Sequence, residues 1–175
     1  MYRIIWSPWR YEYIKTFTSG KEYRECILCI LPRKSDEESL IIHRGNYTYV
    51  VLNAYPYNSG HLMIVPYRHV KDLNSLSNEE SMELVNNLKY SIDVLRRALK
   101  PDGFNIGINL GRVAGAGIED HIHVHVVPRW CGDSNFMPVI AGIKSLPIAL
   151  RETYNLLKKY WVIYEDSGGE EALDH

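Results

Sequence analysis

The chain has 175 residues, of which 46% are hydrophobic and 23% charged, a length and composition that suit one soluble globular domain with its own core. Its formal net charge of -1 excludes the bulk basic surface that recruits nucleic acid, so we expect no nucleic-acid partner. It has neither an apolar run near the ~20 residues of a membrane span nor a signal-peptide core at its start, so we expect a cytoplasmic location and no membrane partner.

Residues 1–25 lack a clean period and are predicted to form an N-terminal arm with a short helix. The arm leads to Cys26 and Cys29, which have the Cys-x-x-Cys spacing of zinc ligands. Together with Cys131 they make an odd number of cysteines, which fits a reducing compartment better than a disulfide framework. Two reduced core cysteines remain the alternative for this pair, and a thioredoxin-like redox role is disfavoured because no βαβ pattern surrounds it.

Three strands are predicted after the cysteine pair. Residues 40–43 and 47–53 form two of them, joined by an Arg-Gly-Asn turn. After the loop AYPYNSG, residues 61–66 (HLMIVP) form the third, which its terminal proline stops. His69 directly follows this strand and is a candidate third metal ligand.

A long amphipathic helix is predicted next. Ser77 followed three residues later by Glu80 is the signature of a capping box at its start, and the segment Pro-Asp-Gly at 101–103 ends it. Between them, apolar residues recur at spacings of three and four, which indicates a buried stripe. The stripe consists of Val85, Leu88, Ile92, Leu95 and Leu99.

The remaining elements complete an α+β pattern. Residues 104–109 alternate as a fourth strand, the small-residue loop GRVAGAG follows at 111–117, and a histidine-rich segment forms the fifth strand. A second helix is predicted at about residues 147–161, and the acidic tail 165–175 is expected to be frayed. Hairpins of strands with two separated helices predict an antiparallel sheet of about five strands with two main helices, in one domain spanning residues 1–175.

The segment EDHIHVHVVPRW, residues 119–130, places histidines at every second position. A period of two is a strand signal, so we expect the β-branched residues to be buried on one face and the imidazoles to share the other. Pro128 is expected to end the strand because it cannot donate to a ladder. The histidine face fits either a metal site or a nucleophilic histidine with two helpers, whereas purely structural histidines would each need a buried partner. The histidines are His121, His123 and His125, and the residues between them are Ile122, Val124 and Val126.

Together these residues resemble the histidine triad superfamily, whose signature is His-φ-His-φ-His-φ-φ with φ apolar. HIHVHVV at 121–127 is a complete match, and NAYPYNSGHLMIVPYRHV at 53–70 is similar to the nucleotide-binding strand pair of that family. The resemblance covers roughly residues 26–130. The opening SPWRYEYI and the run PRWCGDSNFMPV at 128–139 resemble the branch that acts on dinucleoside polyphosphates, which includes diadenosine tetraphosphate phosphorylases.

The resemblance implies an adenine nucleotide or dinucleoside polyphosphate as substrate, cleaved at the α-phosphate through a nucleotidyl-histidine. Phosphate or water would then be the acceptor. His123 would be the nucleophile, and His125 and His61 would lie beside the phosphates. Asn53 matches the residue that holds the ribose, and Asn109 matches a polar residue near the phosphate site. The resemblance also implies a homodimer.

A zinc site is implied as well. Galactose-phosphate uridylyltransferases, a related branch, and some bacterial members bind zinc through a Cys-x-x-Cys pair, a later histidine and the first histidine of the triad. On this resemblance the ligands here would be Cys26, Cys29, His69 and His121. Four protein ligands leave no open position for water, so the zinc would be structural.

The chain departs from the commonest members just before the triad, where Ala-Gly-Ile stands at 116–118 in place of Gly-Gln-Ser. We expect backbone N–H groups of Gly115, Ala116 and Gly117 to contact the phosphates instead, as glycine loops do. Candidate binders of an incoming phosphate, with solvated surface cations as the alternative, are Arg112, Arg129 and Lys144.

Two other functions remain open from the sequence. One is a metal-dependent hydrolase that uses the triad as ligands, although only Glu119 and Asp120 are close enough in sequence to add a carboxylate. The other is a nucleotide-binding module with little catalysis. The sequence does not indicate the preferred base or polyphosphate length.

Overall fold

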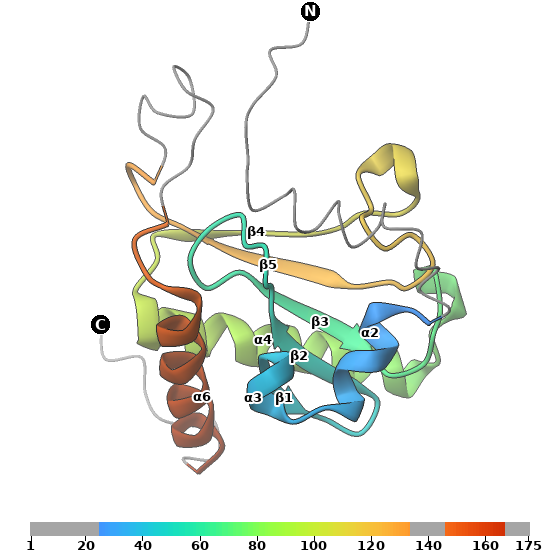
Figure 1. Ribbon diagram of the computed structural model, residues 1–175, viewed down its shortest axis with the longest axis horizontal. Helices are drawn as coiled ribbons and strands as arrows, with labels where there is room; N and C mark the ends of the chain where they lie inside the picture. Colours follow the sequence, from blue (N-terminus) through green and yellow to red (C-terminus); the bar gives the residue numbers. More distant parts are fainter. Residues whose placement is uncertain (1–24, 134–145, 167–175) are drawn as a thin grey trace, which may run out of the picture.

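The computed structural model describes residues 25–133 and 146–166, which form an α+β fold on an antiparallel sheet (Figure 1). The strands follow the order β1-β2-β3-β5-β4, and every neighbouring pair is antiparallel. The predicted fold class and strand number are confirmed within these residues. The strands are β1 (Ile41–Arg44), β2 (Thr48–Leu52), β3 (Leu62–Pro66), β4 (Gly103–Ile108) and β5 (Val124–Arg129).

Two long helices and several short ones complete the described part of the chain. Figure 1 shows α4 passing behind the strands, while α2 lies in front of them. In the described ranges no helix is both long enough and apolar enough to cross a membrane. The helices are α2 (Ile27–Ile30), α3 (Asp36–Ser39), α4 (Asn78–Leu99) and α6 (Leu150–Asp166), with the 3-10 turns η1 (Leu31–Arg33), η2 (Leu73–Ser75) and η3 (Arg112–Ala114).

The two faces of the sheet have different partners because successive strand residues point to opposite sides. One face packs against α4 and α6 and forms the main core. The other face packs against Leu28 of α2 and leads to the histidines. The core face carries Val50, Leu52, Leu62, Ile64, Val124 and Val126. The opposite face carries Tyr49, Val51, Met63 and Val65.

The start of α4 agrees with the predicted capping box. The Ser77 hydroxyl accepts the Glu80 N–H, and the Glu80 carboxylate accepts the Ser77 N–H at 2.7 Å. The predicted stripe was wrong at Val85, which is 44% exposed, whereas its neighbour Leu84 is buried. Leu84 is the residue in register with Leu88 and Leu95 at helical spacing, so it takes the place on the core side.

The histidine segment differs from prediction at both ends. β5 begins only at Val124, which pairs with Ile64 of β3. Two residues beyond Ile64, Pro66 has no N–H to extend the ladder, and the Ile122 N–H donates instead to the Val70 carbonyl at 2.7 Å. At the other end Pro128 does not stop the strand, which runs to Arg129. Pro128 is paired with Phe104 of β4, but its carbonyl accepts from Asn58 on the other side, so its missing N–H lies away from the β4 ladder.

The C-terminal helix was predicted at about residues 147–161, and α6 runs from Leu150 to Asp166. Residues 165 and 166, assigned by sequence to the acidic tail, therefore belong to the helix. Trp161 is buried in the core, and its Nε1–H donates to Glu165 at 2.9 Å, which holds the last turn. Most of the predicted arm (1–24) and the remainder of the tail (167–175) lie outside the described residues.

Candidate functional site

Three histidines meet on the sheet face opposite α4. His61 immediately precedes β3, His125 lies within β5, and His123 immediately precedes β5. Because β3 and β5 are neighbours, the His61 and His125 rings lie 5.1 Å apart between centroids, and the His123 and His125 rings 4.8 Å. The structure thus brings together all three residues that the sequence assigned to catalysis.

The hydrogen bond of His123 defines which ring nitrogen is free. Its Nδ1 lies 2.9 Å from the backbone carbonyl oxygen of His121. A carbonyl oxygen only accepts, so Nδ1 carries the proton and donates. The Nε2 atom of the neutral ring therefore keeps its lone pair and is the nitrogen that can attack an electrophile.

A second chain of hydrogen bonds orients His61 and His125. The Tyr57 N–H donates to His61 Nδ1 at 3.1 Å, so the His61 proton is on Nε2. His61 Nε2–H then donates to His125 Nδ1 at 2.9 Å. His125 consequently carries its own proton on Nε2, where it can donate to a bound anion.

Burial keeps this cluster uncharged near neutral pH. It lowers the pKa of His61 to about 3, with smaller contributions from His125 and His123. Burial, followed by the neighbouring His123, lowers the pKa of His125 to about 4. Burial also lowers the pKa of His123, although the hydrogen bond to His121 opposes the shift. The site therefore offers one neutral nitrogen lone pair beside a neutral N–H donor.

Of the two predicted nucleotide-binding asparagines, Asn53 contacts His61. Asn53 follows β2, and its carboxamide oxygen accepts the Tyr55 N–H at 2.9 Å while Nδ2 lies 3.3 Å from His61 Nδ1. Asn109 directly follows Ile108, the residue of β4 that pairs with Val124. Both side chains are half-buried, and their roles stay predictions.

The small-residue loop forms a closed turn around η3. The Gly115 N–H donates to the Arg112 carbonyl at 3.0 Å, and the Ala116 N–H donates to the Gly111 carbonyl at 3.4 Å. Gly115 has a φ of 92°, a left-handed conformation that glycine adopts without strain. Two of the predicted phosphate-binding amides therefore already have carbonyl partners. The roles of these residues and of Gly117 remain predictions.

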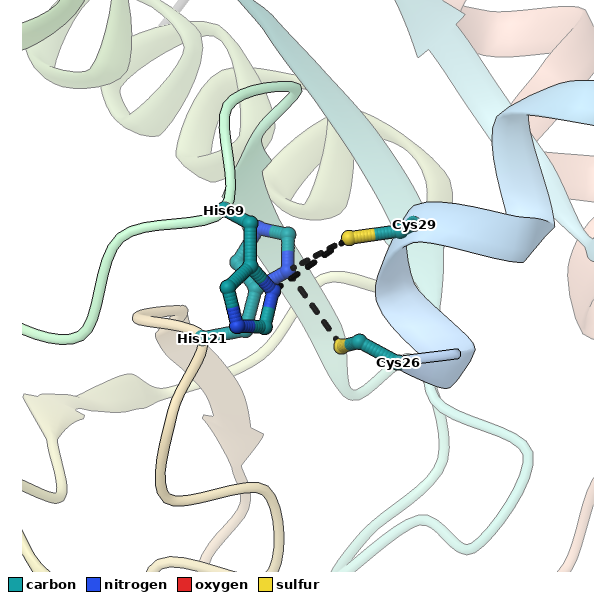
Figure 2. Close-up of side chains that lie close together, drawn as sticks. All are labelled: Cys26, Cys29, His69 and His121. Atoms are coloured by element: carbon teal, nitrogen blue, oxygen red, sulfur yellow. Dashed lines mark hydrogen bonds between the residues drawn. The ribbon is translucent and has the colours of Figure 1, made fainter. Parts of the chain in front are cut away.

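The four predicted metal ligands converge, with the rings of His69 and His121 facing the sulfurs of Cys26 and Cys29 (Figure 2). Their ligand atoms all lie within 4.8 Å of one another. The Sγ···Nδ1 distances for Cys26–His121, Cys29–His69 and Cys29–His121 are each 3.4 Å. Tetrahedral zinc with its usual bond lengths requires sulfur and nitrogen ligands to be about 3.5 Å apart. The arrangement of these side chains fits a Cys2His2 zinc site.

The surroundings of the cluster also fit a metal site. His121 is fully buried, and its Nε2–H donates to the Pro66 carbonyl at 2.9 Å, which leaves the Nδ1 lone pair facing the sulfurs. Metal-bound histidines commonly donate their second ring N–H to a carbonyl in this way. Burial and the adjacent Cys26 raise the pKa of the Cys29 thiol to about 11. A cation bound between thiols acts in the opposite direction and deprotonates them.

Two features of the site were not predicted from the sequence. The Tyr57 ring lies 4.7 Å from the His61 ring and 5.9 Å from the His125 ring, so an aromatic side chain borders these two histidines. Its position in a loop four residues before His61 does not by itself specify this contact. Arg129, a candidate phosphate binder, instead binds Asp133 and Asn105. Lys144 lies outside the described residues.

An α+β fold whose antiparallel sheet carries the histidine motif on one face is that of a histidine triad protein. Residues 34–131 match the HIT domain, and the chain belongs to the HIT family. It is 43% identical over 162 residues to the AP-4-A phosphorylase of Mycobacterium tuberculosis, which covers 90% of this chain and 83% of that protein.

Two further similarities are informative. The chain is 32% identical over 91 residues to the Bis(5'-adenosyl)-triphosphatase of Saccharomyces cerevisiae, covering 51% of this chain and 44% of that protein. Among solved structures, a Zn-bound histidine triad family protein from Mycobacterium smegmatis superposes with a TM-score of 0.66 at 26% identity, covering 82% of this chain and 97% of that one.

Proposed function

We propose that the protein cleaves dinucleoside polyphosphates such as diadenosine tetraphosphate at the α-phosphate, through a nucleotidyl-histidine on His123. The observation that carries this proposal is the 2.9 Å hydrogen bond from His123 Nδ1 to the His121 carbonyl, which leaves Nε2 as a free nucleophile. The similarity to an AP-4-A phosphorylase and to a Bis(5'-adenosyl)-triphosphatase supports the substrate class.

In the first step, the Nε2 lone pair of His123 attacks the α-phosphorus, and the bond to the leaving phosphate chain breaks with its electron pair. The ring becomes cationic when the P–N bond forms, and the His121 carbonyl stabilises that charge through the Nδ1–H. His125 donates its Nε2–H to a phosphate oxygen. An oriented donor of this kind is typically worth about 10²–10³ in rate.

In the second step, an acceptor attacks the same phosphorus and the P–N bond breaks, which returns the lone pair to His123. Inorganic phosphate as acceptor gives a nucleoside diphosphate, and water gives a monophosphate. The similarity to a phosphorylase favours phosphate.

We propose that Cys26, Cys29, His69 and His121 hold a structural zinc ion. The separations of the ligand atoms and the Zn-bound relative from Mycobacterium smegmatis support this assignment. Four protein ligands saturate a tetrahedral ion, so the metal would supply folding energy and no reactive water. Only one of the four, His121, comes from the triad, which disfavours a hydrolase that uses the triad as its ligands.

A second copy of the chain is the expected protein partner. β4 is the last strand of the described sheet, and Ile106 on it is 45% exposed. A strand edge with exposed apolar residues favours association through that edge. Analytical ultracentrifugation of the wild type and Ile106→Lys tests this: a dimer that the charge dissociates supports the assignment, and a wild-type monomer contradicts it.

The nucleotidyl-histidine is tested by labelling. Protein is incubated with diadenosine tetraphosphate that carries radiolabel in its α-phosphates, and label that is acid-labile and base-stable is expected on the wild type. It should be absent from His123→Ala and His123→Gly and retained by His43→Ala, which removes a half-buried histidine on β1. Turnover that survives His123→Ala but stops with chelator would establish a metallohydrolase, and tight binding without turnover would establish a binding module.

A further inference from the structure

A cavity of about 390 Å³ lies between the loop at residues 54–60 and the first turn of α6. Its volume falls within the range of roughly 300–1,000 Å³ that is usual for small-molecule sites. The residues that line it include no charged side chain in the described part of the chain. Those that carry the argument are Leu52, Tyr55, Tyr57, Ser59, Ile148 and Thr153.

The Ser59 hydroxyl offers a hydrogen bond to whatever occupies this cavity. Ser59 is 4% exposed, and its Oγ atom has no hydrogen-bond partner among the residues that the structure describes. Thr153, on the opposite wall, donates its hydroxyl proton to the Ala149 carbonyl and is already paired. Buried hydroxyl groups are normally hydrogen-bonded, so an unpartnered one in a cavity wall indicates a polar ligand atom.

Tyr57 connects the cavity to the histidines. Its ring is one wall of the cavity, and the same ring lies 4.7 Å from the His61 ring and 5.9 Å from the His125 ring. Tyr57 therefore borders both the cavity and the His61–His125 pair. A ligand that occupied both places would pass this residue.

We propose that this cavity binds the second nucleoside of a dinucleoside polyphosphate, the one that leaves with the phosphate chain. The inference rests on the proposed function and adds to it a site for the leaving group. The uncharged lining suits a nucleoside rather than a phosphate group. The Tyr55 and Tyr57 rings provide stacking surfaces for a base, and the Ser59 hydroxyl provides a polar contact to its edge.

The test compares two substrates that differ only in the second nucleoside, diadenosine tetraphosphate and adenosine 5′-tetraphosphate. Ser59→Ala removes the hydroxyl, and Ile148→Trp fills the cavity. Val162→Trp adds the same ring at a residue of α6 that is 48% exposed and serves as the control. Circular dichroism melts show that each variant is folded, and KM is measured for both substrates with inorganic phosphate as acceptor.

We expect Ser59→Ala to raise KM for diadenosine tetraphosphate about 3- to 10-fold, as the loss of one hydrogen bond predicts. Ile148→Trp should raise it more than about 10-fold, and neither variant should change KM for adenosine 5′-tetraphosphate. An equal rise for both substrates, or no rise for either, overturns the inference. A wild type that cleaves neither substrate overturns the proposed function and this inference with it, so the two failures are distinguishable.

Discussion

The backbone carbonyl of His121 accepts the Nδ1–H of His123 at 2.9 Å, while the imidazole of the same His121 faces Cys26 and Cys29 at 3.4 Å. One residue therefore belongs to the proposed zinc site through its side chain and to the proposed nucleophile through its main chain. Anchoring the His121 ring would restrain the backbone that carries this carbonyl. The zinc ligands are thus expected to orient His123 as well as to stabilise the fold.

Loss of the metal site should lower stability first and activity second. Cys29→Ser is expected to cost about 4 kcal/mol and to lower the melting temperature by roughly 8–16 °C, and chelation of the wild type should act in the same direction. The variant that remains folded should show a lower kcat, because His123 loses its fixed carbonyl. Cys131→Ser, which alters an exposed cysteine outside the cluster, is the matched control. Equal melting temperatures for the two variants would contradict a metal role.

Removal of the His125 donor should slow the reaction without preventing covalent chemistry. His125→Ala retains His123 with its bond to the His121 carbonyl, so a labelled enzyme should still form. We expect kcat to fall about 10²–10³-fold, which is typical for the loss of one oriented donor to a reacting oxygen. Rapid-quench kinetics measure the first step directly. A fall below 10-fold would mean that His125 does not contact the phosphate.

The local elements of the fold followed from the sequence because their signals are local. Apolar runs bounded by a turn and a proline predicted β2 and β3, and the Ser77–Glu80 capping box predicted the start of α4. The ends of β5 could not be predicted. They depend on which strand lies on each side, since Pro66 blocks one ladder and Pro128 lies where only β4 is paired.

The candidate site also has features that the sequence predicted and features that depend on the tertiary structure. Cys-x-x-Cys spacing and the histidine motif singled out the cysteine pair and the triad, and the family resemblance implied the full set of four metal ligands. The carbonyl that orients His123 could not be identified, because it depends on the chain leaving the β3 ladder before Val124. The contribution of Tyr57 also required the loop to fold back over His61, a contact that no sequence spacing specifies.

Glu83 on α4 holds the turn between β1 and β2 and is predicted to be a large contributor to stability. Its carboxylate accepts the N–H groups of Asn46, Tyr47 and Thr48 at 3.0, 2.9 and 2.7 Å, and also the Thr48 hydroxyl at 2.9 Å. Burial raises the pKa of Glu83, but these hydrogen bonds outweigh it and lower the pKa overall. Glu83→Ala should cost about 2–3 kcal/mol of unfolding free energy in urea titrations, because it leaves several donors unpaired.

Glu152→Ala is the matched control for this change, since Glu152 is an exposed carboxylate in the first turn of α6. It should alter stability by less than about 0.5 kcal/mol, as surface substitutions usually do. Two equal losses would show that Glu83 acts as an ordinary surface charge.

The buried histidines should make stability decline as the pH falls below the ordinary histidine pKa. His61 has a pKa of about 3 in the folded protein, compared with 6.5 for an unperturbed ring. On acidification the His61 ring is protonated near pH 6.5 in the unfolded chain but only near pH 3 in the folded protein. The stability present above pH 6.5 is therefore lost as the pH falls towards 3. Each such proton contributes a slope of about 1.4 kcal/mol per pH unit between the two values.

His61→Gln removes the titrating ring and tests whether its protonation causes the loss of stability. The variant has a lower stability at neutral pH because it loses contacts, but its unfolding free energy should decline less steeply than that of the wild type between pH 6 and pH 4. Urea unfolding at half-unit pH steps measures both slopes, and the carboxylates that titrate in this range cancel in the difference. Parallel curves would show that His61 is protonated equally in the folded and unfolded states, and the neutral hydrogen-bond chain to His125 would then be incorrect.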